Sequence, residues 1–557
     1  MKTILSAFEQ ALRSHDDLIK RRDLAIWIGA EPTFTDRHSE APEWLCNALG
    51  PTKERHARQM LAESLVSMPD AVVLRTLGRQ YSKEDQPRWS LGLYRRRDGQ
   101  PVWSGPPDPL TVDCASIPAT TDLLEDFWER LAQRLGARGW PALLLTVETI
   151  PNLRVVFRCD GLPLLANPER DARLARPSLH GQPIPLQGPR DELAEQGIYL
   201  LGIGRPSSVQ GFGETVAPCV ELPACPDPRL FLSLLEAIGE AANAAGLSSL
   251  ILAGFPPPVD ASVAWTTLTP DPAVVEANMA PAPDTTVFLQ ETRACFAAAA
   301  AAGLSPYRLH YNGQITDSGG GGQITLGGPT PDRSPFLAHP HLLPALIAYF
   351  NRHPALSFYF AGDFIGSSSQ APRADERTVD LFEELTLALA LLGRQCNPTP
   401  ELLWQTLSPF LADPAGNPHR AEINIEKLWN PYLPGRGCLG LVEFRAFRMP
   451  STPERLTALA TLLRAIAAML IQSPKRLRLM HWGRELHDRF ALPFYLRADL
   501  WEVLDELASV GLGLGQPLIT ELLNEEHSWI GEATFGSCQL TIRRGLEFWP
   551  LLGVCRT

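Results

Sequence analysis

A run of four glycines, Gly319 to Gly322, is the first stretch of this sequence whose residue types suggest chemistry. Consecutive glycines leave backbone N–H groups open to a ligand, and loops of this kind bind phosphate oxygens. Gln323 and Thr325 follow, each succeeded by an apolar residue, which is the alternation of a strand with one polar face. Loop and strand together predict a floor for a nucleotide and its metal ions. The alternative for the glycines alone is a flexible hairpin tip.

Carboxylates recur beside amides or arginines on three further predicted strands. Glu276 and Asn278 share one face of a short strand, and Glu443 and Arg445 share one face of a later strand. The stretch HRAEINIEKLW places four polar side chains on one face: Arg420, Glu422, Asn424 and Glu426. Carboxylate and amide oxygens suit Mg²⁺, and arginine binds phosphate or carboxylate through two parallel hydrogen bonds. Solvated charge ladders on exposed sheet faces are the alternative.

Glu31 ends a predicted buried strand in the sequence LAIWIGAEPTFT. A buried carboxylate without a partner is costly, so this glutamate needs a cation nearby. If the strand instead ends at the surface, Glu31 is a solvated turn residue. We expect Glu31, Glu276 and Glu443 to converge on one cleft, where their carboxylates would hold one or two cations.

Composition and charge exclude several classes of protein. The chain has 557 residues, a formal net charge of −12 and a pI near 5.6, which argues against a general nucleic-acid or anionic-membrane surface. Ten cysteines are scattered without a C-x-x-C pair, as in reduced cytosolic proteins. No signal peptide or membrane span is visible, so we expect a cytoplasmic protein that binds neither nucleic acid nor membrane. The sequence has no P-loop, HExxH or GxSxG motif, and no GxGxxG opens a helix after a strand.

Helical and strand patterns alternate along the chain, which predicts an α+β fold with a large, mostly antiparallel sheet. The predicted parts are an N-terminal part of the catalytic domain (1–104), an insertion or satellite subdomain (105–220), the main part of the catalytic domain (221–475), and a C-terminal helical segment with a hairpin (476–557). The insertion is rich in proline and arginine and is the least interpretable part. A strand is also predicted at Ser357–Phe364 and a terminal hairpin at Gly531–Ile542.

Six stretches, in this order, resemble the bacterial putative amidoligase family: LAIWIGAEPTFT, LTPDPAVVEANMAP, SGGGGQITLGG, FAGDFIGSSSQAPRADE, GNPHRAEINIEKL and GLVEFRAFRMP. Members are often fused to a transglutaminase-like domain. The resemblance covers most of the chain and is weakest across 105–220 and at the C-terminus. It implies an ATP- and Mg²⁺-dependent ligase that joins a carboxylate to an amine through an acyl phosphate. It also implies a large curved antiparallel sheet with helices on its outer side, as in glutamine synthetase and glutamate–cysteine ligase.

The resemblance implies a role for each matching polar residue. The implied Mg²⁺ ligands, with Mn²⁺ as the alternative ion, are Glu31, Glu276, Glu443 and Glu422. The implied ATP-binding residues are Gly319, Gly320, Gly321, Gly322, Gln323, Thr325, Asn278 and Arg373. Arg445 and Arg420 are the implied catalytic cations, and Arg445 would contact the transferred phosphoryl group. The expected substrates are a small amino acid, a peptide or a protein terminus.

Two positions depart from the family around the glycine loop. Gln323 stands where a metal-side histidine is expected, and Ile315 stands where another is expected upstream. Glutamine can supply an oxygen to Mg²⁺ but no imidazole nitrogen. Ala30 and Ala273 replace glycines that are common in relatives. The alternative function is therefore a catalytically impaired relative that binds nucleotide or peptide, or a structural partner of another enzyme. Neither the substrates nor the oligomeric state follows from the sequence.

Overall fold

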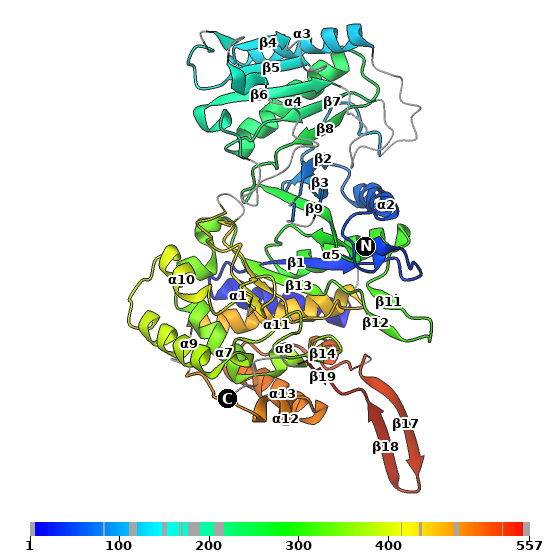
Figure 1. Cartoon of the computed structure of the whole chain (residues 1–557), viewed down its shortest axis with the longest axis vertical. Helices are drawn as coiled ribbons and strands as arrows, with labels where there is room; N and C mark the ends of the chain where they lie inside the picture. The colour runs from blue at the N-terminus through cyan, green and yellow to red at the C-terminus, as the bar shows by residue number, and fades with distance from the viewer. Residues whose placement is uncertain are drawn as a thin grey trace. The chain divides into compact units, whose positions relative to one another are not determined.

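The computed structural model of the chain divides into two compact units (Figure 1). Unit 1 comprises Met1–Glu40, Pro281–Ala297 and Leu304–Thr557, and unit 2 comprises Ala41–Ala280 and Ala298–Gly303. The structure describes residues 6–78, 80–81, 84–110, 120–146, 153–165, 167–168, 171–175, 190–204, 217–413, 415–433, 437–472, 478–525 and 527–549.

Four strands of unit 1 carry most of the predicted site. Their order is β15 (Ile423–Asn424), β16 (Val442–Phe444), β13 (Gly322–Gly327) and β1 (Trp27–Phe34), and all three pairings are antiparallel. On one face the side chains are apolar and fully buried, as at Ile28, Ile324 and Phe444. The opposite face is polar, because residues two apart in a strand share a face.

Helix α11 (Pro453–Gln472) packs against β13 and forms the centre of unit 1. All residues from 455 to 470 are buried, as in a helix surrounded by protein. The buried Arg464 ties α11 to two other segments. Its guanidinium donates to the backbone carbonyl of Ile26 at 2.9 Å and lies 2.6 Å from Asp16 of α1. The helix therefore fixes the entry of the chain into β1.

The other helices of unit 1 surround this centre. They are α1 (Ala7–Arg21), α5 (Thr285–Ala301, whose last turn belongs to unit 2), η5 (Pro331–Arg333), α6 (Pro335–Ala338), α7 (Leu342–Arg352), α8 (Ala355–Phe358), η6 (Ala374–Glu376), α9 (Val379–Leu392), α10 (Pro400–Leu407), α12 (Glu485–Phe490), α13 (Pro493–Ser509) and α14 (Gln516–Leu522).

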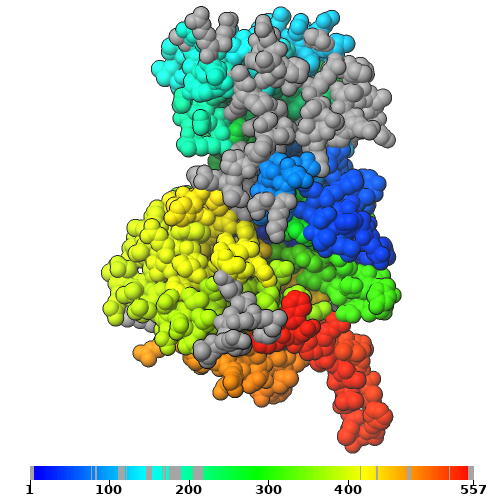
Figure 2. Space-filling view, in the orientation of Figure 1, coloured from blue at the N-terminus to red at the C-terminus, as the bar shows by residue number. Residues whose placement is uncertain are grey.

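Three small strand pairs complete unit 1. They are β11 (Tyr307–Leu309) with β12 (Ile315–Asp317), β14 (Phe364–Ile365) with β19 (Glu547–Phe548) in parallel, and β17 (Trp529–Phe535) with β18 (Cys538–Arg543). The β17–β18 pair forms the red arm that projects from the rest of unit 1 in Figure 2. It confirms the terminal hairpin predicted from the sequence.

Unit 2 holds nine paired strands and three α-helices in its described part. The strand order is β10 (Val274–Asn278), β9 (Val263–Asp271), β3 (Trp89–Arg96), β2 (Val72–Leu77), β8 (Ile251–Gly254), β7 (Cys219–Leu222), β6 (Ile198–Gly204), β5 (Leu153–Arg158) and β4 (Ala142–Thr146). The helices are α2 (Pro51–Ser67), α3 (Thr121–Ala137) and α4 (Pro228–Ala244), with short turns η1 (Pro42–Trp44), η3 (Ala172–Ala175) and η4 (Ala194–Gln196). Residues of α3 and α4 share one apolar core with β2, β5, β6 and β7.

The hydrogen-bonded strands of unit 1 and of unit 2, with their helices, confirm the predicted α+β class with mostly antiparallel pairing. Among the described strands of unit 2, the two parallel pairings are those of β8 with β2 and with β7. The likeness of the sheet to that of glutamine synthetase stays a prediction. So do the predicted domain boundaries, although strands β4, β5 and β6, from within 105–220, and β7, which crosses residue 220, continue the strand order that contains β8. No helix of the described residues has the length and apolar character needed to cross a bilayer.

Three local predictions are corrected by the structure. The strand predicted at Ser357–Phe364 is wrong, because the chain forms the short helix α8 and only Phe364 enters a strand. Short apolar runs fit a buried helix as well as a buried strand. Strand β1 does not end at Glu31 but continues to Phe34. The predicted strands in HRAEINIEKLW and around Glu443 are also shorter than predicted: β15 has two residues and β16 has three.

Candidate active site

The polar face of the unit 1 sheet brings together residues that are far apart in the sequence. Glu31 on β1 pairs with Gln323 on β13, and Thr325 on β13 pairs with Glu443 on β16. Glu443 also pairs with Asn424 on β15. Directly paired residues of antiparallel strands share a face, as do residues two apart in one strand. All five side chains therefore lie on one face, and all five residues are buried.

Lys427 links the two glutamates of this face. Its ammonium forms an ion pair with Glu31 Oε1 and lies 3.3 Å from Glu443 Oε2. The lysine side chain is 24% exposed, whereas the two carboxylate side chains are 9% and 2% exposed. Burying an unpaired carboxylate is costly, so one ammonium stabilises both. Glu31 thus has the cationic partner that its burial requires.

Arg445 supplies the second positive charge at Glu443. Its Nη1 forms an ion pair with Glu443 Oε1, from two residues along the chain. The backbone N–H of Arg445 donates to the carbonyl of Glu422 at 2.9 Å, which fixes the segment beyond β16. The predicted sharing of one face by Glu443 and Arg445 is therefore confirmed by their contact.

Burial and charge act differently on the two glutamates. Burial and the nearby charge of Glu443 raise the pKa of Glu31, and Lys427 opposes that rise. Burial would also raise the pKa of Glu443, but Arg445 and Lys427 outweigh it and lower that pKa to about 2. Glu443 is therefore the carboxylate that stays ionised, while Glu31 depends on Lys427 for its charge.

Gln323 offers an unused oxygen on the same face. Its Nε2 donates to the carbonyl of Gly320 at 2.8 Å. Its Oε1 is buried and accepts no hydrogen bond from any described residue. An unsatisfied buried acceptor costs free energy. Because Gln323 pairs with Glu31, this oxygen lies on the acidic face, where a cation or a donor would satisfy it.

The glycine loop lies directly before β13 and is held by its own chain. Gly319 and Gly321 have φ values of 102° and 79°, which L side chains rarely adopt. The N–H of Gly319 donates to Asp317 Oδ1 at 3.2 Å, and the N–H of Gly322 donates to the carbonyl of Phe447 at 3.0 Å. At least these two donors are engaged inside the chain. The contact of the loop with phosphate stays a prediction.

Arg373 and Glu422 belong to a separate buried cluster. Arg373 is fully buried and donates to both oxygens of Asp375, at 2.8 and 2.7 Å, and to the carbonyl of Asn351 at 3.0 Å. Glu422 accepts from Ser357 Oγ at 2.5 Å and lies 3.8 Å from Arg373. Burial raises the pKa of Glu422 to about 7, although the charge of Arg373 opposes this. These contacts stabilise the fold, and the ligand contacts of both residues stay predictions.

Three further predicted residues lie elsewhere. Arg420 precedes β15 and donates to the carbonyls of residues 368 and 369 at 2.8 and 3.0 Å. Glu276 and Asn278 lie on β10 in unit 2, where Asn278 Nδ2 donates to Glu276 Oε1 at 3.0 Å. Their predicted common face is therefore confirmed. The convergence of Glu276 with Glu31 and Glu443 stays a prediction.

Lys427 is the residue that sequence reasoning missed. Strand alternation from Arg420 to Glu426 assigns Lys427 to the opposite, apolar face. The strand ends at Asn424, however, and a turn follows in which the N–H of Leu428 donates to the carbonyl of Ile425 at 3.0 Å. The turn changes the direction of the side chain. The available signal was a lysine directly after Glu426, in a motif that carries two glutamates.

The donor set of this face fits a hard divalent cation. Glu31 and Glu443 supply carboxylate oxygens, and Gln323 supplies the amide oxygen without a partner. All three are oxygen ligands of the kind that Mg²⁺ prefers. The ammonium of Lys427 already lies between the carboxylates, which shows that the space between them suits a positive charge.

A different group of side chains has metal-like spacing within the described residues. His353, Asp499 and Glu502 place one ligand atom each within 4.8 Å of one another. Asp499 already accepts from His353 Nδ1 and from the N–H of Ala355, both at 2.8 Å. These bonds anchor the start of α8 to α13, so this group is explained by packing.

The chain matches the family described as "Putative amidoligase enzyme (DUF2126)" over residues 5–143 and 215–557. The matched part contains every residue of the polar sheet face, and the unmatched residues 144–214 lie within the predicted insertion 105–220. No curated protein and no solved structure matches the chain significantly.

Proposed function

This chain belongs to the "Putative amidoligase enzyme" family, and on that premise we propose that it is an ATP- and Mg²⁺-dependent carboxylate–amine ligase. It would form an amide or peptide bond through an acyl phosphate. The observation that carries the proposal is the buried polar face on which Glu31, Gln323 and Glu443 lie together in the sheet register. Buried charge of this kind serves no packing need, because an apolar strand face would be more stable.

Glu31 and Glu443, with Gln323 Oε1, would hold the cation. Mg²⁺, when bound, would neutralise negative charge on the phosphates of ATP during phosphoryl transfer. Glu443 would be ionised for this task at neutral pH, because its pKa is lowered to about 2. Glu31 would exchange its ion pair with Lys427 for a bond to the cation.

Arg445 and Lys427 would supply the positive charge that faces the phosphoryl group. A guanidinium offers two parallel hydrogen bonds to phosphate and stays charged. Arg445 adjoins Glu443, so it would reach the same phosphoryl group from the next position along the strand direction. Once Glu31 binds the cation, the ammonium of Lys427 would be free to contact a phosphate oxygen. Its flexible stem and rotatable N–H donors would let it follow that oxygen as the phosphoryl group is transferred.

The carboxylate and the amine would come from a small amino acid, a peptide or a protein terminus. We assign the reaction to the cytoplasm, where ATP is available. The eight cysteines in the described residues are all free, which is in keeping with a reducing compartment.

The test is ATP turnover by the purified chain with Mg²⁺ across a panel of carboxylates and amines. The proposal predicts ADP and phosphate formation that requires both substrates, with the amide found by mass spectrometry. Glu443→Gln should abolish turnover. Glu125→Gln, the same change on an exposed position of α3, is the matched control and should not. Turnover that ignores the amine would contradict ligation.

A second function is favoured by two observations. Lys427 occupies the position between the two glutamates, and Gln323 replaces the histidine expected in the family. Both would suit a relative that binds nucleotide or peptide without turnover. Binding of MgATP by calorimetry, together with no phosphate release for any pair of substrates, would identify this second function.

A further inference from the structure

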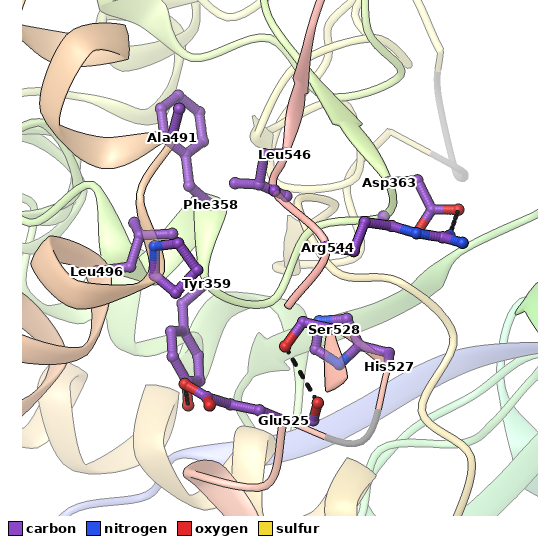
Figure 3. Close-up of a pocket in the computed structure, with 13 residues that line it drawn as sticks. Phe358, Tyr359, Asp363, Ala491, Leu496, Glu525, His527, Ser528, Arg544 and Leu546 are labelled. Atoms are coloured by element: carbon purple, nitrogen blue, oxygen red, sulfur yellow. Dashed lines mark hydrogen bonds and ion pairs between the residues drawn. The ribbon is translucent and has the colours of Figure 1, made fainter. Parts of the chain in front are cut away.

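A pocket in unit 1 lies apart from the polar sheet face. Figure 3 shows its two kinds of wall. One wall is apolar and includes Phe358, Leu496 and Leu546. The other wall is polar and includes Tyr359, Asp363, Glu525, His527, Ser528 and Arg544, and the carboxylates of Asp363 and Glu525 are both paired with arginines. The polar wall comes from the residues that follow α8, from the segment before β17 and from the segment after β18, so three parts of the chain must fold together to form it.

Arginines surround the polar wall. Arg544 lies 3.0 Å from Asp363, and Arg448 lies 3.8 Å from the same carboxylate. Arg543 forms an ion pair with Glu525, which also lies 4.0 Å from Arg497. Asp363 and Glu525 therefore each lie between two arginines.

The positive charge of the arginines affects the pKa values of two uncharged side chains in the polar wall, His527 and Tyr359. Burial, together with the charges of Arg448, Arg455 and Arg544, lowers the pKa of His527 to about 3. No hydrogen bond links the ring of His527 to another described residue. For Tyr359 burial raises the pKa, and neighbouring arginines oppose that rise. The neutral imidazole therefore stands in a cationic environment with its ring nitrogens available to a ligand.

One guanidinium nitrogen near the pocket also lacks a hydrogen-bond acceptor. Arg448 Nη1 is buried and donates no hydrogen bond within the described part of the chain. Its nearest carboxylate, Asp363, is 3.8 Å away, beyond hydrogen-bond distance. A buried donor without an acceptor is costly. An anion in the neighbourhood would stabilise both this nitrogen and the imidazole.

We propose that this pocket binds a small organic carboxylate, with its charged end between Arg544, Ser528 and His527 and its apolar stem against Phe358 and Leu496. Guanidinium, hydroxyl and imidazole groups can all donate to carboxylate oxygens. To bind the ligand, Ser528 Oγ would exchange its hydrogen bond to the carbonyl of Glu525, at 3.1 Å, for one to the carboxylate, and Arg544 would share its guanidinium between Asp363 and the ligand. The apolar wall selects a carboxylate with a hydrocarbon stem over a bare inorganic anion, because burying the stem stabilises the complex.

The site stands apart from the proposed ligase reaction, because it needs neither ATP nor a metal ion. The segment Phe447–Arg448 nevertheless lies next to both the pocket and the glycine loop of the proposed ligase site. The backbone N–H of Arg448 donates to the carbonyl of Phe360 at 2.8 Å, while the carbonyl of the preceding Phe447 accepts from Gly322. Occupancy of the pocket is measured without ATP, so its failure would leave the proposed ligase untouched.

The experiment uses the full chain labelled with ¹³C at histidine Cε1 and followed by NMR. The probes are 4-methylpentanoate, its neutral amide 4-methylpentanamide, and inorganic phosphate. The signal of His527 is assigned by its loss in His527→Gln. We expect the chemical shift of His527 ¹³Cε1 to change in a saturable way with 4-methylpentanoate and with neither of the other two probes. We also expect the pKa of His527 to rise on binding, because an adjacent anion stabilises the imidazolium.

Arg544→Gln should weaken binding of 4-methylpentanoate at least tenfold. Arg229→Gln, the same change at a side chain that is 94% exposed in unit 2, should leave it unchanged. If Arg544→Gln fails to fold, Arg544→Lys tests the same contact, because an ammonium cannot give two parallel hydrogen bonds. The proposal is overturned if no probe moves the His527 signal, if the amide moves it as much as the carboxylate, or if phosphate alone moves it.

Discussion

Replacing Lys427 with methionine removes the ammonium between two buried glutamates and leaves the apolar part of the side chain in place. Glu443 keeps its ion pair with Arg445, whereas the ion pair shown for Glu31 is lost. Removing one partner of a buried ion pair typically destabilises a protein by about 3–5 kcal/mol. We expect about 3 kcal/mol for Lys427→Met, near the lower end of that range, because protonation of Glu31 relieves part of the cost.

The same substitution should increase the response of the protein to Mg²⁺. In the wild type a cation must displace the ammonium before it can bind Glu31 and Glu443. In Lys427→Met the two carboxylates and Gln323 Oε1 are free of that competitor. A ligand at a hundred times its dissociation constant stabilises the folded state by about 2.7 kcal/mol. Saturating Mg²⁺ should therefore restore most of the lost stability.

The assay is urea unfolding with and without Mg²⁺, in the wild type and two variants. Lys53→Met is the matched control. Lys53 is also buried, and its ammonium donates to the backbone carbonyls of Asn47 and Asp271, at 3.0 and 2.7 Å. Its loss should destabilise the protein without creating a cation site. If Mg²⁺ raised the free energy of unfolding of Lys427→Met and of Lys53→Met by the same amount, the reasoning would be refuted.

Four further outcomes follow from the geometry. Arg445→Lys should lower kcat about 10²–10³-fold with little change in melting temperature; near-normal turnover with a lowered melting temperature would make Arg445 purely structural. Gln323→His should preserve or raise Mg²⁺-dependent ATP turnover, and collapse of turnover in a folded variant would show that the glutamine has its own role. The pKa of Glu422 is about 7 in the folded chain, above its value in the unfolded chain. The protonated carboxyl therefore stabilises the fold at low pH, and this stabilisation is lost as the pH rises. Between about pH 5 and pH 8 the wild type should therefore lose stability relative to Glu422→Gln, and parallel urea midpoints would contradict this. Ala273 has a φ of 69°, which costs an alanine about 1–2 kcal/mol, while glycine loses about 0.5–1 kcal/mol more backbone entropy on folding. Ala273→Gly should therefore stabilise the fold by about 0.5–1 kcal/mol in the same unfolding assay, and a lowered midpoint would contradict that strain.

The sequence was most informative where strand alternation and polar residues coincide. Val274–Asn278 was predicted as a strand and is β10. The polar faces of β13 and β16 follow directly from the period of two, which placed Gln323 with Thr325 and Glu443 with Arg445. The order of these strands in the sheet was not predictable in the same way, because pairing joins segments that are hundreds of residues apart.

Two parts of the site could not be read from local patterns. The direction of Lys427 depends on a turn that breaks strand alternation after Asn424. The burial of Arg373 depends on acceptors from α7 and η6, which no spacing in its own motif reveals. Ala273 shows the reverse case: its replacement of a family glycine was noticed in the sequence, and the structure gives it a left-handed backbone.

Transfer of oxygen from the substrate carboxylate to phosphate tests the central claim most directly. ATP turnover is run with a substrate whose carboxylate carries ¹⁸O, and the released phosphate is analysed by mass spectrometry. A carboxylate that attacks the γ-phosphorus of ATP leaves one of its oxygens on the phosphate when the amine displaces it. The account predicts one ¹⁸O atom in each phosphate formed. Unlabelled phosphate would contradict an acyl phosphate, and label in AMP would indicate activation at the α-phosphorus instead.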